Sequence, residues 1–443
     1  MLFALPGNVQ AQTLNEELSV LLVTHPTIER ARKDVDVAGE DVNIAHSEFL
    51  PDVDVVGDVG YEYTNRPLEA QGDQSLSTDR ETAFLTVTEN LFDGFRKNNA
   101  LDSAKINERI ADLSLTSTIQ EILLQGVVAY HDVLRQSQLV ELALANEERI
   151  REQLELEDER VRRGGGISVD VLFAKSRLQI AKERRVAFQG ALRDANIRYV
   201  QVFNRPPQFG SMEYPEPPID LLPLSLDEAI AIANNENPEL LASNRQVDVA
   251  DKQRDIAKSE YYPRVDLVGS AGVENNVDGI EGDRQEVSVL VEFSWNLFSG
   301  FETESRVSRA SAEYSASMSN LSQTRRNVAE GARLAFNELG TAREREALLD
   351  NAVNISAEVF EARKKLREGG KETTVNVLDA ETELNNALID HTVARFESQI
   401  ASYRLLAAIG RLTPRSLNLA SADSASGWSA TTVVPQFGAK SNK

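Results

Sequence analysis

The sequence contains no cysteine. This excludes disulfide bonds, thiolate metal sites and a lipid-anchored cysteine near the N-terminus. The four histidines, His25, His46, His131 and His391, are scattered without the spacing of metal ligands, and no nucleophile motif is present. We therefore expect no enzymatic activity, no cofactor and no metal site.

Positive charge is also scarce. Lysine and arginine number 47 against 70 aspartates and glutamates, which gives a formal net charge of −23. A nucleic-acid-binding protein needs a basic face to neutralise phosphates, so the charge balance excludes nucleic acid as a partner.

Long apolar runs are missing as well. No uninterrupted apolar stretch approaches the ~18 residues that a transmembrane helix requires. Residues 1–12 resemble the end of a signal peptide, with Val9 and Ala11 at the small-residue positions before a cleavage site. We interpret this segment as a remnant signal peptide; the alternative is a disordered end.

Proline, the residue that most reliably breaks a helix, is absent between Pro67 and Pro206. The only strong interruption inside the segment 95–205 is the triplet Gly164, Gly165 and Gly166, which is typical of a chain reversal. The pattern predicts a hairpin of two very long helices. At ~1.5 Å per residue the first helix would be on the order of 100 Å long, far more than a compact globular core requires.

This stretch occurs twice in the sequence. A shift of 206 residues places the motif at 90–95 on that at 296–301, and the motif at 169–172 on that at 375–378. Upstream the shift becomes 212 and places Pro51 on Pro263. We expect two structural repeats, 13–205 and 224–413, joined by a proline-rich linker at 206–223 and followed by a flexible tail at 414–443.

Each repeat opens with a capping box, at Thr13 to Glu16 and at Ser225 to Glu228, which marks a helix start. After Pro51 and Pro263 the apolar period changes from that of a helix to two, which predicts β-hairpins at 52–92 and 264–298. The apolar positions of the first strand are Val53, Val55, Val59, Tyr61 and Tyr63, and acidic residues alternate with them.

A strand with one apolar and one polar face suits a transmembrane barrel with lipid outside and water inside. A small solvent-exposed sheet packed on helices is the alternative. Because every backbone group must be paired in lipid, four strands cannot form such a barrel alone, so a barrel would have to be assembled from several chains.

The second helical hairpin, at 301–411, reverses at Gly369 and Gly370. Its first helix carries a narrow apolar seam with the four-and-three spacing of a coiled coil. The seam consists of Leu348, Ala352, Ile355, Val359, Ala362 and Leu366.

This arrangement resembles the TolC-type outer-membrane channel family (outer membrane efflux and type I secretion proteins). The specific marks are the Asn-Leu-Phe-x-Gly motifs starting at Asn90 and Asn296, the Ala-Tyr/Phe pairs starting at Ala129 and Ala335, and the tip motifs at 169–172 and 375–380. The resemblance implies an α+β membrane protein that forms a homotrimer, with a shared barrel of 12 strands continued by a long α-helical periplasmic tunnel. It also implies outer-membrane lipid, a periplasmic adaptor and an inner-membrane ABC or RND transporter as partners.

The resemblance further implies functional residues. The adaptor would dock at the two tips, at Gly164, Gly165, Gly166, Gly369 and Gly370. The periplasmic gate would lie at Asp379, with Asn376 where the family carries a second aspartate and Asp170 at the equivalent position in the first repeat. Carboxylates crowded around a threefold axis would favour cations.

The predicted function is therefore the exit duct of a tripartite export system in the outer membrane of a Gram-negative bacterium. Type I protein secretion is preferred, because the Leu-Phe-x-Gly-Phe signature and the missing lipid anchor resemble that branch. Small-molecule efflux is the alternative. A soluble coiled-coil scaffold, from a different class, would explain the long helices but not the strand hairpins.

Overall fold

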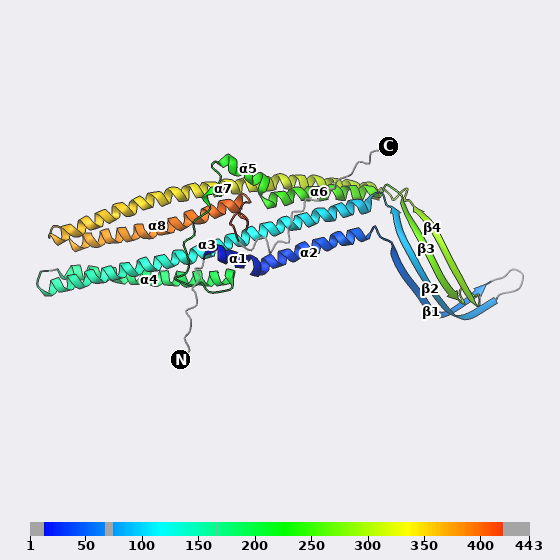
Figure 1. The fold of residues 1–443 in the computed structure, drawn as a ribbon, viewed down its shortest axis with the longest axis horizontal. Coiled ribbons are helices and arrows are strands. Elements are labelled where there is room, and N and C mark those ends of the chain that lie inside the picture. The colour runs from blue at the N-terminus through cyan, green and yellow to red at the C-terminus, as the bar shows by residue number, and fades with distance from the viewer. Residues whose placement is uncertain (1–12, 67–73, 166, 420–443) are drawn as a thin grey trace, which may run out of the picture. The chain divides into compact units, whose positions relative to one another are not determined.

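The computed structural model describes residues 13–66, 74–165 and 167–419 (Figure 1). The predicted remnant signal peptide, Gly166 and all of the predicted tail after residue 419 lie outside the described residues. Within the described residues, no helix has both the length and the apolar character needed to cross a membrane.

The chain forms two compact units, and each draws on both sequence repeats. Of the described residues, a helical unit contains those up to Arg30, those in Thr116–Pro238 and those from Arg326 onward, whereas a sheet unit contains those in Ala31–Leu115 and Glu239–Arg325. Helices α3 (Arg96–Arg162) and α7 (Glu302–Glu368), each of 67 residues, contribute to both units. The two units therefore do not coincide with the two repeats.

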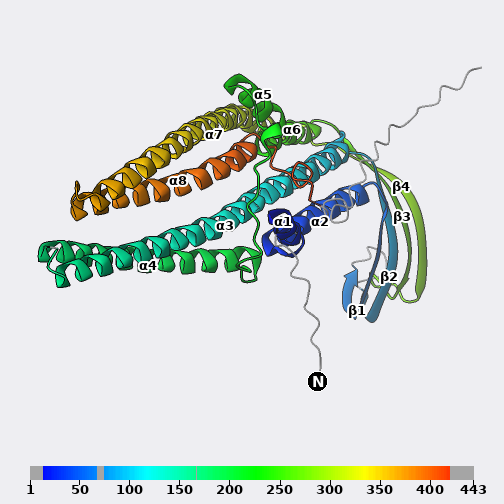
Figure 2. The same ribbon diagram turned by 60° about the vertical axis from the view of Figure 1, so that its left-hand side comes forward.

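The sheet unit contains one antiparallel sheet with the order β1-β2-β3-β4 (Figures 1 and 2). Its strands are β1 (Asp52–Arg66), β2 (Gln74–Phe92), β3 (Arg264–Asn275) and β4 (Asp283–Ser294). Pro51 and Pro263 separate β1 and β3 from the preceding helices, α2 (Pro26–Ser47) and α6 (Pro238–Ser259). Within the described residues, β1 and β4 each pair with one neighbour and leave the other edge unpaired.

The register gives this sheet two chemically distinct faces. One row across the four strands is Asp54, Thr86, Ser270 and Ser288, and the next is Val55, Leu85, Ala271 and Val287. In the single chain the apolar face is uncovered, since Val55 is 77% exposed and Val287 is 80% exposed. The alternation read from the sequence is thus the alternation of the folded sheet.

Each hairpin passes into its long helix through a glycine and a phenylalanine in the left-handed conformation. Gly94 and Phe95 have φ of 70° and 69°, and Gly300 and Phe301 have φ of 65° and 67°. At Gly94 a Cβ atom would lie 2.6 Å from the Ser259 carbonyl oxygen, so only glycine fits there. A phenylalanine with positive φ costs on the order of 1–2 kcal/mol, and the same strain recurs in both repeats.

The helical unit contains two hairpins, α3 with α4 (Ser168–Phe203) and α7 with α8 (Thr374–Ala408). Helices α4 and α8 are in contact. The largest fully buried side chains include Tyr130, Tyr199 and Phe396. Left-handed residues follow the returning helices, with φ of 53° at Asn204 and 85° at Gly410.

Shorter helices brace this unit. Helix α1 (Leu14–Thr24) begins with the full capping box of Thr13 and Glu16. Helix α5 (Leu226–Glu236) follows a short 3₁₀ helix at Ile219–Leu221 and is capped by the Ser225 side chain, which accepts from the Glu228 N–H. Both helix starts predicted from the sequence are therefore confirmed.

Candidate gate at the helix reversals

The two long hairpins reverse within a few residues, at positions that permit a left-handed backbone. Helix α3 ends at Arg162 and α4 begins at Ser168, and φ is 78° at Gly164. Helix α7 ends at Glu368 and α8 begins at Thr374, and φ is 69° at Gly370. A Cβ atom at Gly164 or Gly370 would meet nothing within 4 Å, so conformation rather than space favours glycine at these two positions.

The other predicted tip glycines flank these two residues. Gly165 and Gly369 are exposed and have no positive φ, and Gly166 lies outside the described residues. The tips therefore offer exposed backbone, as expected for a docking surface, but the left-handed turn is made by one glycine in each tip.

Asp379 is one half of an ion pair. Its Oδ1 atom accepts from Arg177 Nη2 at 2.6 Å, although 51% of the Asp379 side chain stays exposed. Seven residues further along each helix, Arg184 Nη1 donates to Asn386 Oδ1 at 2.7 Å. These contacts fix the register of α4 against α8, and they place a guanidinium beside the carboxylate predicted to form the gate.

Asn376 is held by the N-terminal cap of α8. Its backbone N–H donates to the side chain of Thr373, the N-cap residue, and its amide nitrogen donates to Glu372 Oε1 at 2.6 Å. The hydrogen bond from Asn376, followed by that from the Thr373 N–H, lowers the pKa of Glu372. Arg363 donates to the Asn376 carbonyl oxygen at 3.2 Å, so the residue is tied to α7 as well.

Asp170 lies in the first turn of α4 and is half-buried. A carboxylate in that turn is favoured by the partial positive charge of the helix N-terminus. Within the described residues, no hydrogen bond or ion pair joins Asp170, Asn376 and Asp379 to one another.

Two buried glutamates that the sequence did not single out connect the hairpins. Glu157 is 1% exposed and accepts from Arg160 Nη1 at 2.9 Å and from Arg367 Nη2 at 3.1 Å, which joins α3 to α7. Glu381 is 2% exposed and accepts from Arg149 Nε at 3.1 Å, which joins α3 to α8. Removing one partner of a buried ion pair typically costs ~3–5 kcal/mol, because the other charge is left buried and unpaired; this cost is not a net gain from the pair.

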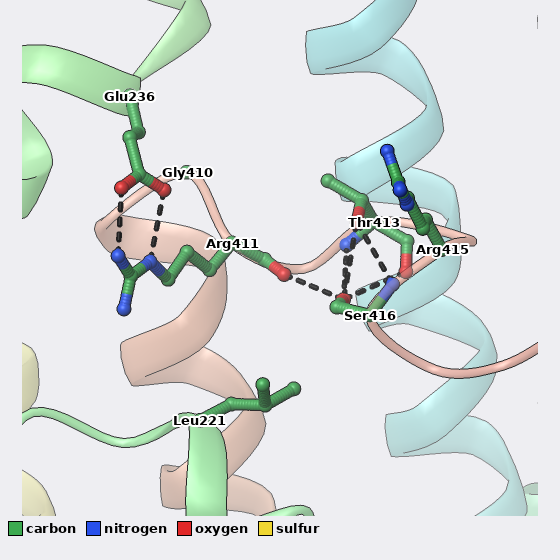
Figure 3. A pocket seen from close by; sticks show the side chains of 7 residues that line it. All are labelled: Leu221, Glu236, Gly410, Arg411, Thr413, Arg415 and Ser416. Carbon is green, nitrogen blue, oxygen red and sulfur yellow. Dashed lines mark hydrogen bonds and ion pairs between the residues drawn. The ribbon is translucent and has the colours of Figure 1, made fainter.

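A cavity of about 280 Å³ lies beyond the C-terminal end of α8 (Figure 3). It is lined by Leu221, Glu236, Gly410, Arg411, Thr413, Arg415 and Ser416. Arg411 donates through Nε and Nη2 to both Glu236 oxygens at 2.8 and 2.7 Å, which lowers the pKa of Glu236. This ion pair braces α5 against the end of α8, so we read the cavity as a structural feature.

The sequence matches the model of the outer membrane efflux protein family over residues 18–204 and 229–411. It is 25% identical to the outer membrane protein TolC of Escherichia coli (strain K12), over 92% of this chain and 84% of the relative. It is 26% identical to the alkaline protease secretion protein AprF of Pseudomonas aeruginosa, over 72% of this chain and 67% of the relative.

The fold is similar to that of the outer-membrane channel OprN, with a TM-score of 0.77, 20% sequence identity, and 90% of this chain and 89% of that chain covered. The family matches cover both repeats, and the solved structure shows the same fold. The chain therefore belongs to the outer membrane efflux protein family, the TolC-type channels to which the sequence motifs pointed.

Proposed function

We propose that three copies of the chain close one 12-stranded barrel in the outer membrane, continue it as a helical tunnel in the periplasm, and so form the exit duct of a tripartite export system. The observation that carries this proposal is the sheet of the single chain, which in the described part of the chain has two unpaired edges and an uncovered apolar face.

An open sheet of this kind is unstable in either solvent. In lipid the edge groups of β1 and β4 would lack hydrogen-bond partners, and in water the row of Val55 and Val287 would stay exposed. Pairing β4 of one copy with β1 of the next removes both edges and directs the apolar face to lipid. The opposite face, with Asp54, Thr86 and Ser288, then lines a water-filled interior.

Membership of the family supports the same reading. The chain is an outer-membrane protein of a Gram-negative bacterium that extends into the periplasm, and members of the family are channels rather than enzymes. Such channels are trimeric and work with periplasmic adaptors and inner-membrane transporters.

The trimer is tested by chemical crosslinking of the detergent-solubilised protein. Each chain has a mass of 48.9 kDa, and we expect a ladder that stops at three chains. Without crosslinker, boiling in denaturant should return the single chain, because no covalent bond would join the copies. A ladder that ends at one or two chains would refute the shared barrel.

We further propose that the cargo is protein, exported by type I secretion. Among the relatives, AprF is named an alkaline protease secretion protein and PrtF of Dickeya chrysanthemi a proteases secretion protein. Small-molecule efflux is the second candidate, since BepC of Brucella suis is named an outer membrane efflux protein.

Deletion of the gene in its own host separates the two candidates. Secretion predicts that a few large proteins disappear from the medium and return on complementation, whereas growth in antibiotics and detergents changes little. The reverse pattern, with an unchanged secreted proteome and increased drug sensitivity, would support efflux in place of secretion.

We propose that the gate lies at the reversals, with Asp379 of each copy in a ring about the threefold axis. Asp170 and Asn376 would flank this ring, and the adaptor would engage Gly164, Gly165, Gly166, Gly369 and Gly370. The ion pair of Asp379 with Arg177 supports a refinement. A guanidinium at 2.6 Å reduces the field of each carboxylate, so Arg177→Gln should increase cation selectivity in planar bilayers.

A further inference from the structure

We propose that a proton-binding site lies between α3 and α8, at the carboxyl group of Glu381, and that separation of the two helices releases its proton. This site is separate from the ion pairs at the exposed tip surface, because Glu381 lies inside the packed helices. The site itself depends only on the fold of the chain, whereas its effect on conductance rests on the proposed function.

The carboxyl group has one satisfied and one unsatisfied oxygen. Oε1 accepts from Arg149, whereas Oε2 is shielded from solvent and has no hydrogen-bond partner among the residues that the structure describes. One turn further along α8, the Oδ1 atom of Asn385, a residue that is 1% exposed, is also buried and unpartnered. Residues four apart share a helix face, so both oxygens lie on the buried face of α8.

Helix α3 presents a matching group. Asn146 lies three residues before Arg149, on the same face of α3, and its Oδ1 atom is buried and unpartnered. Because α3 runs toward the reversal and α8 runs away from it, a step forward on α8 corresponds to a step backward on α3. Asn385 and Asn146 therefore lie on the same side of the Glu381–Arg149 pair along the interface.

All three unpartnered atoms are hydrogen-bond acceptors. An unsatisfied buried polar atom costs about 1–3 kcal/mol, and a charged group costs more, so an ionised carboxylate is unfavourable in a place that already lacks donors. A proton on Oε2 converts one acceptor into a donor, which can then bond to a neighbouring amide oxygen. One proton thus satisfies two groups at once.

The surrounding charges disfavour a metal cation at this site. Arg149 from α3 and Lys364 from α7 favour the ionised carboxylate and Glu152 from α3 opposes them, but burial outweighs the two cations and favours the proton. On α4 the nearby Arg177 is engaged by Asp379, two residues from Glu381. Two positive groups beside a buried carboxyl would repel a divalent ion, whereas a proton leaves the group neutral.

Burial raises the pKa of Glu381 above its ordinary value of 4.5, and Arg149 only partly offsets this effect. A raised carboxyl pKa means that the packed arrangement binds the proton more tightly than a hydrated one does. Acid therefore stabilises the packing of α8 on α3, and this contribution is lost as the pH rises through the raised pKa. Helix separation hydrates the carboxyl, restores its ordinary pKa and releases the proton.

Infrared spectroscopy tests the proton directly. In the wild-type trimer we expect a carboxylic-acid C=O band that persists above pH 4.5, the ordinary value for glutamate. Glu381→Gln, which preserves size, should remove this band, and the exposed Glu383 provides the control Glu383→Gln, which should retain it. Asn385→Leu should shift its frequency, because an acceptor is lost. A spectrum that Glu381→Gln and Asn385→Leu both leave unchanged would overturn the site.

Bilayer recordings test the coupling. Open probability of the wild type should rise as the pH is raised above 4.5, the ordinary value for glutamate, and Glu381→Gln should abolish that rise and stay at the acid level. Glu383→Gln should behave as the wild type. Equal pH responses of the wild type and Glu381→Gln would overturn the coupling. A preparation that forms no channel would instead refute the proposed duct, and the infrared comparison does not depend on conductance.

Discussion

His131 should make the helical unit sensitive to acid. Its side chain is fully buried, and its Nδ1 atom lies 2.7 Å from the Val127 carbonyl oxygen. The ring packs against Tyr403, with ring centroids 5.8 Å apart, and against Phe396 at 6.3 Å. Its Nε2 atom has no hydrogen-bond partner within the described part of the chain. The imidazole is therefore held neutral among aromatic rings.

Burial lowers the pKa of His131 from 6.5 to about 4. The unfolded chain takes up a proton at this position below pH 6.5, whereas the folded chain resists protonation until about pH 4. Stability is thus lost as the pH falls through this window. At 1.36 kcal/mol per pKa unit the full loss is about 3 kcal/mol per chain, a large share of the stability of an ordinary domain.

The assay is thermal unfolding followed by helical circular dichroism between pH 7.5 and pH 4. His131→Gln keeps a donor for the Val127 carbonyl oxygen and cannot ionise, so its melting temperature should fall less with pH than that of the wild type. The control is His46→Gln, at an exposed position near the end of α2. The contribution of Glu381 to stability has the opposite pH dependence. The test therefore compares the variants with one another and does not use the absolute slope of melting temperature against pH. Parallel curves for the wild type and His131→Gln would refute the reasoning.

Three further substitutions test the sheet, the docking tip and the gate. Gly272→Ala would place its Cβ 2.2 Å from the Phe84 ring and should cost about 1–3 kcal/mol, which would lower the temperature at which the trimer dissociates on gels. The control Gly60→Ala, whose Cβ would meet nothing within 4 Å among the described residues, should leave that temperature unchanged. Equal dissociation temperatures for the two variants would contradict the clash. Gly370→Leu should leave the trimer intact but abolish export, and normal export would remove this tip from the docking surface. Asp379→Asn should weaken cation selectivity in planar bilayers, and an unchanged reversal potential would remove Asp379 from the gate.

Local features of the fold could be read from the sequence because they depend on neighbouring residues. Pro51 and Pro263 separate helix from strand, and the glycine-rich reversals and the caps at Thr13 and Ser225 lie where their chemistry requires. The alternation of apolar and polar residues gave the two faces of the sheet, since the side-chain period of a strand is two.

The pairings across the helical unit could not be predicted in this way. Arg177 lies 202 residues from Asp379, and Arg149 lies 232 residues from Glu381, so no local pattern joins them. Asn376 was assigned to the gate from its position in the tip motif, but only the structure shows that its amide completes a helix cap.

One signal for the buried site was present in the sequence. Glu381 lies three residues after Leu378, and Asn385 lies four residues after Glu381. Both therefore lie on the buried stripe of α8. A charged residue in an otherwise buried phase indicates either an ion pair or a titrating group. Deciding between an ion pair and a titrating group requires knowing which residues of the partner helix face Glu381, and the sequence does not show this.

The unpaired edges of β1 and β4 also have a genetic consequence. If closure of each barrel requires both edge strands of all three copies, one defective copy inactivates the whole trimer. With normal and defective chains made in equal amounts and mixed freely, only roughly one trimer in eight would be entirely normal. An edge-strand variant such as Val289→Pro, which removes a backbone donor from β4, should therefore act as a dominant inhibitor of export when expressed beside the wild type, provided that it still enters the assembly.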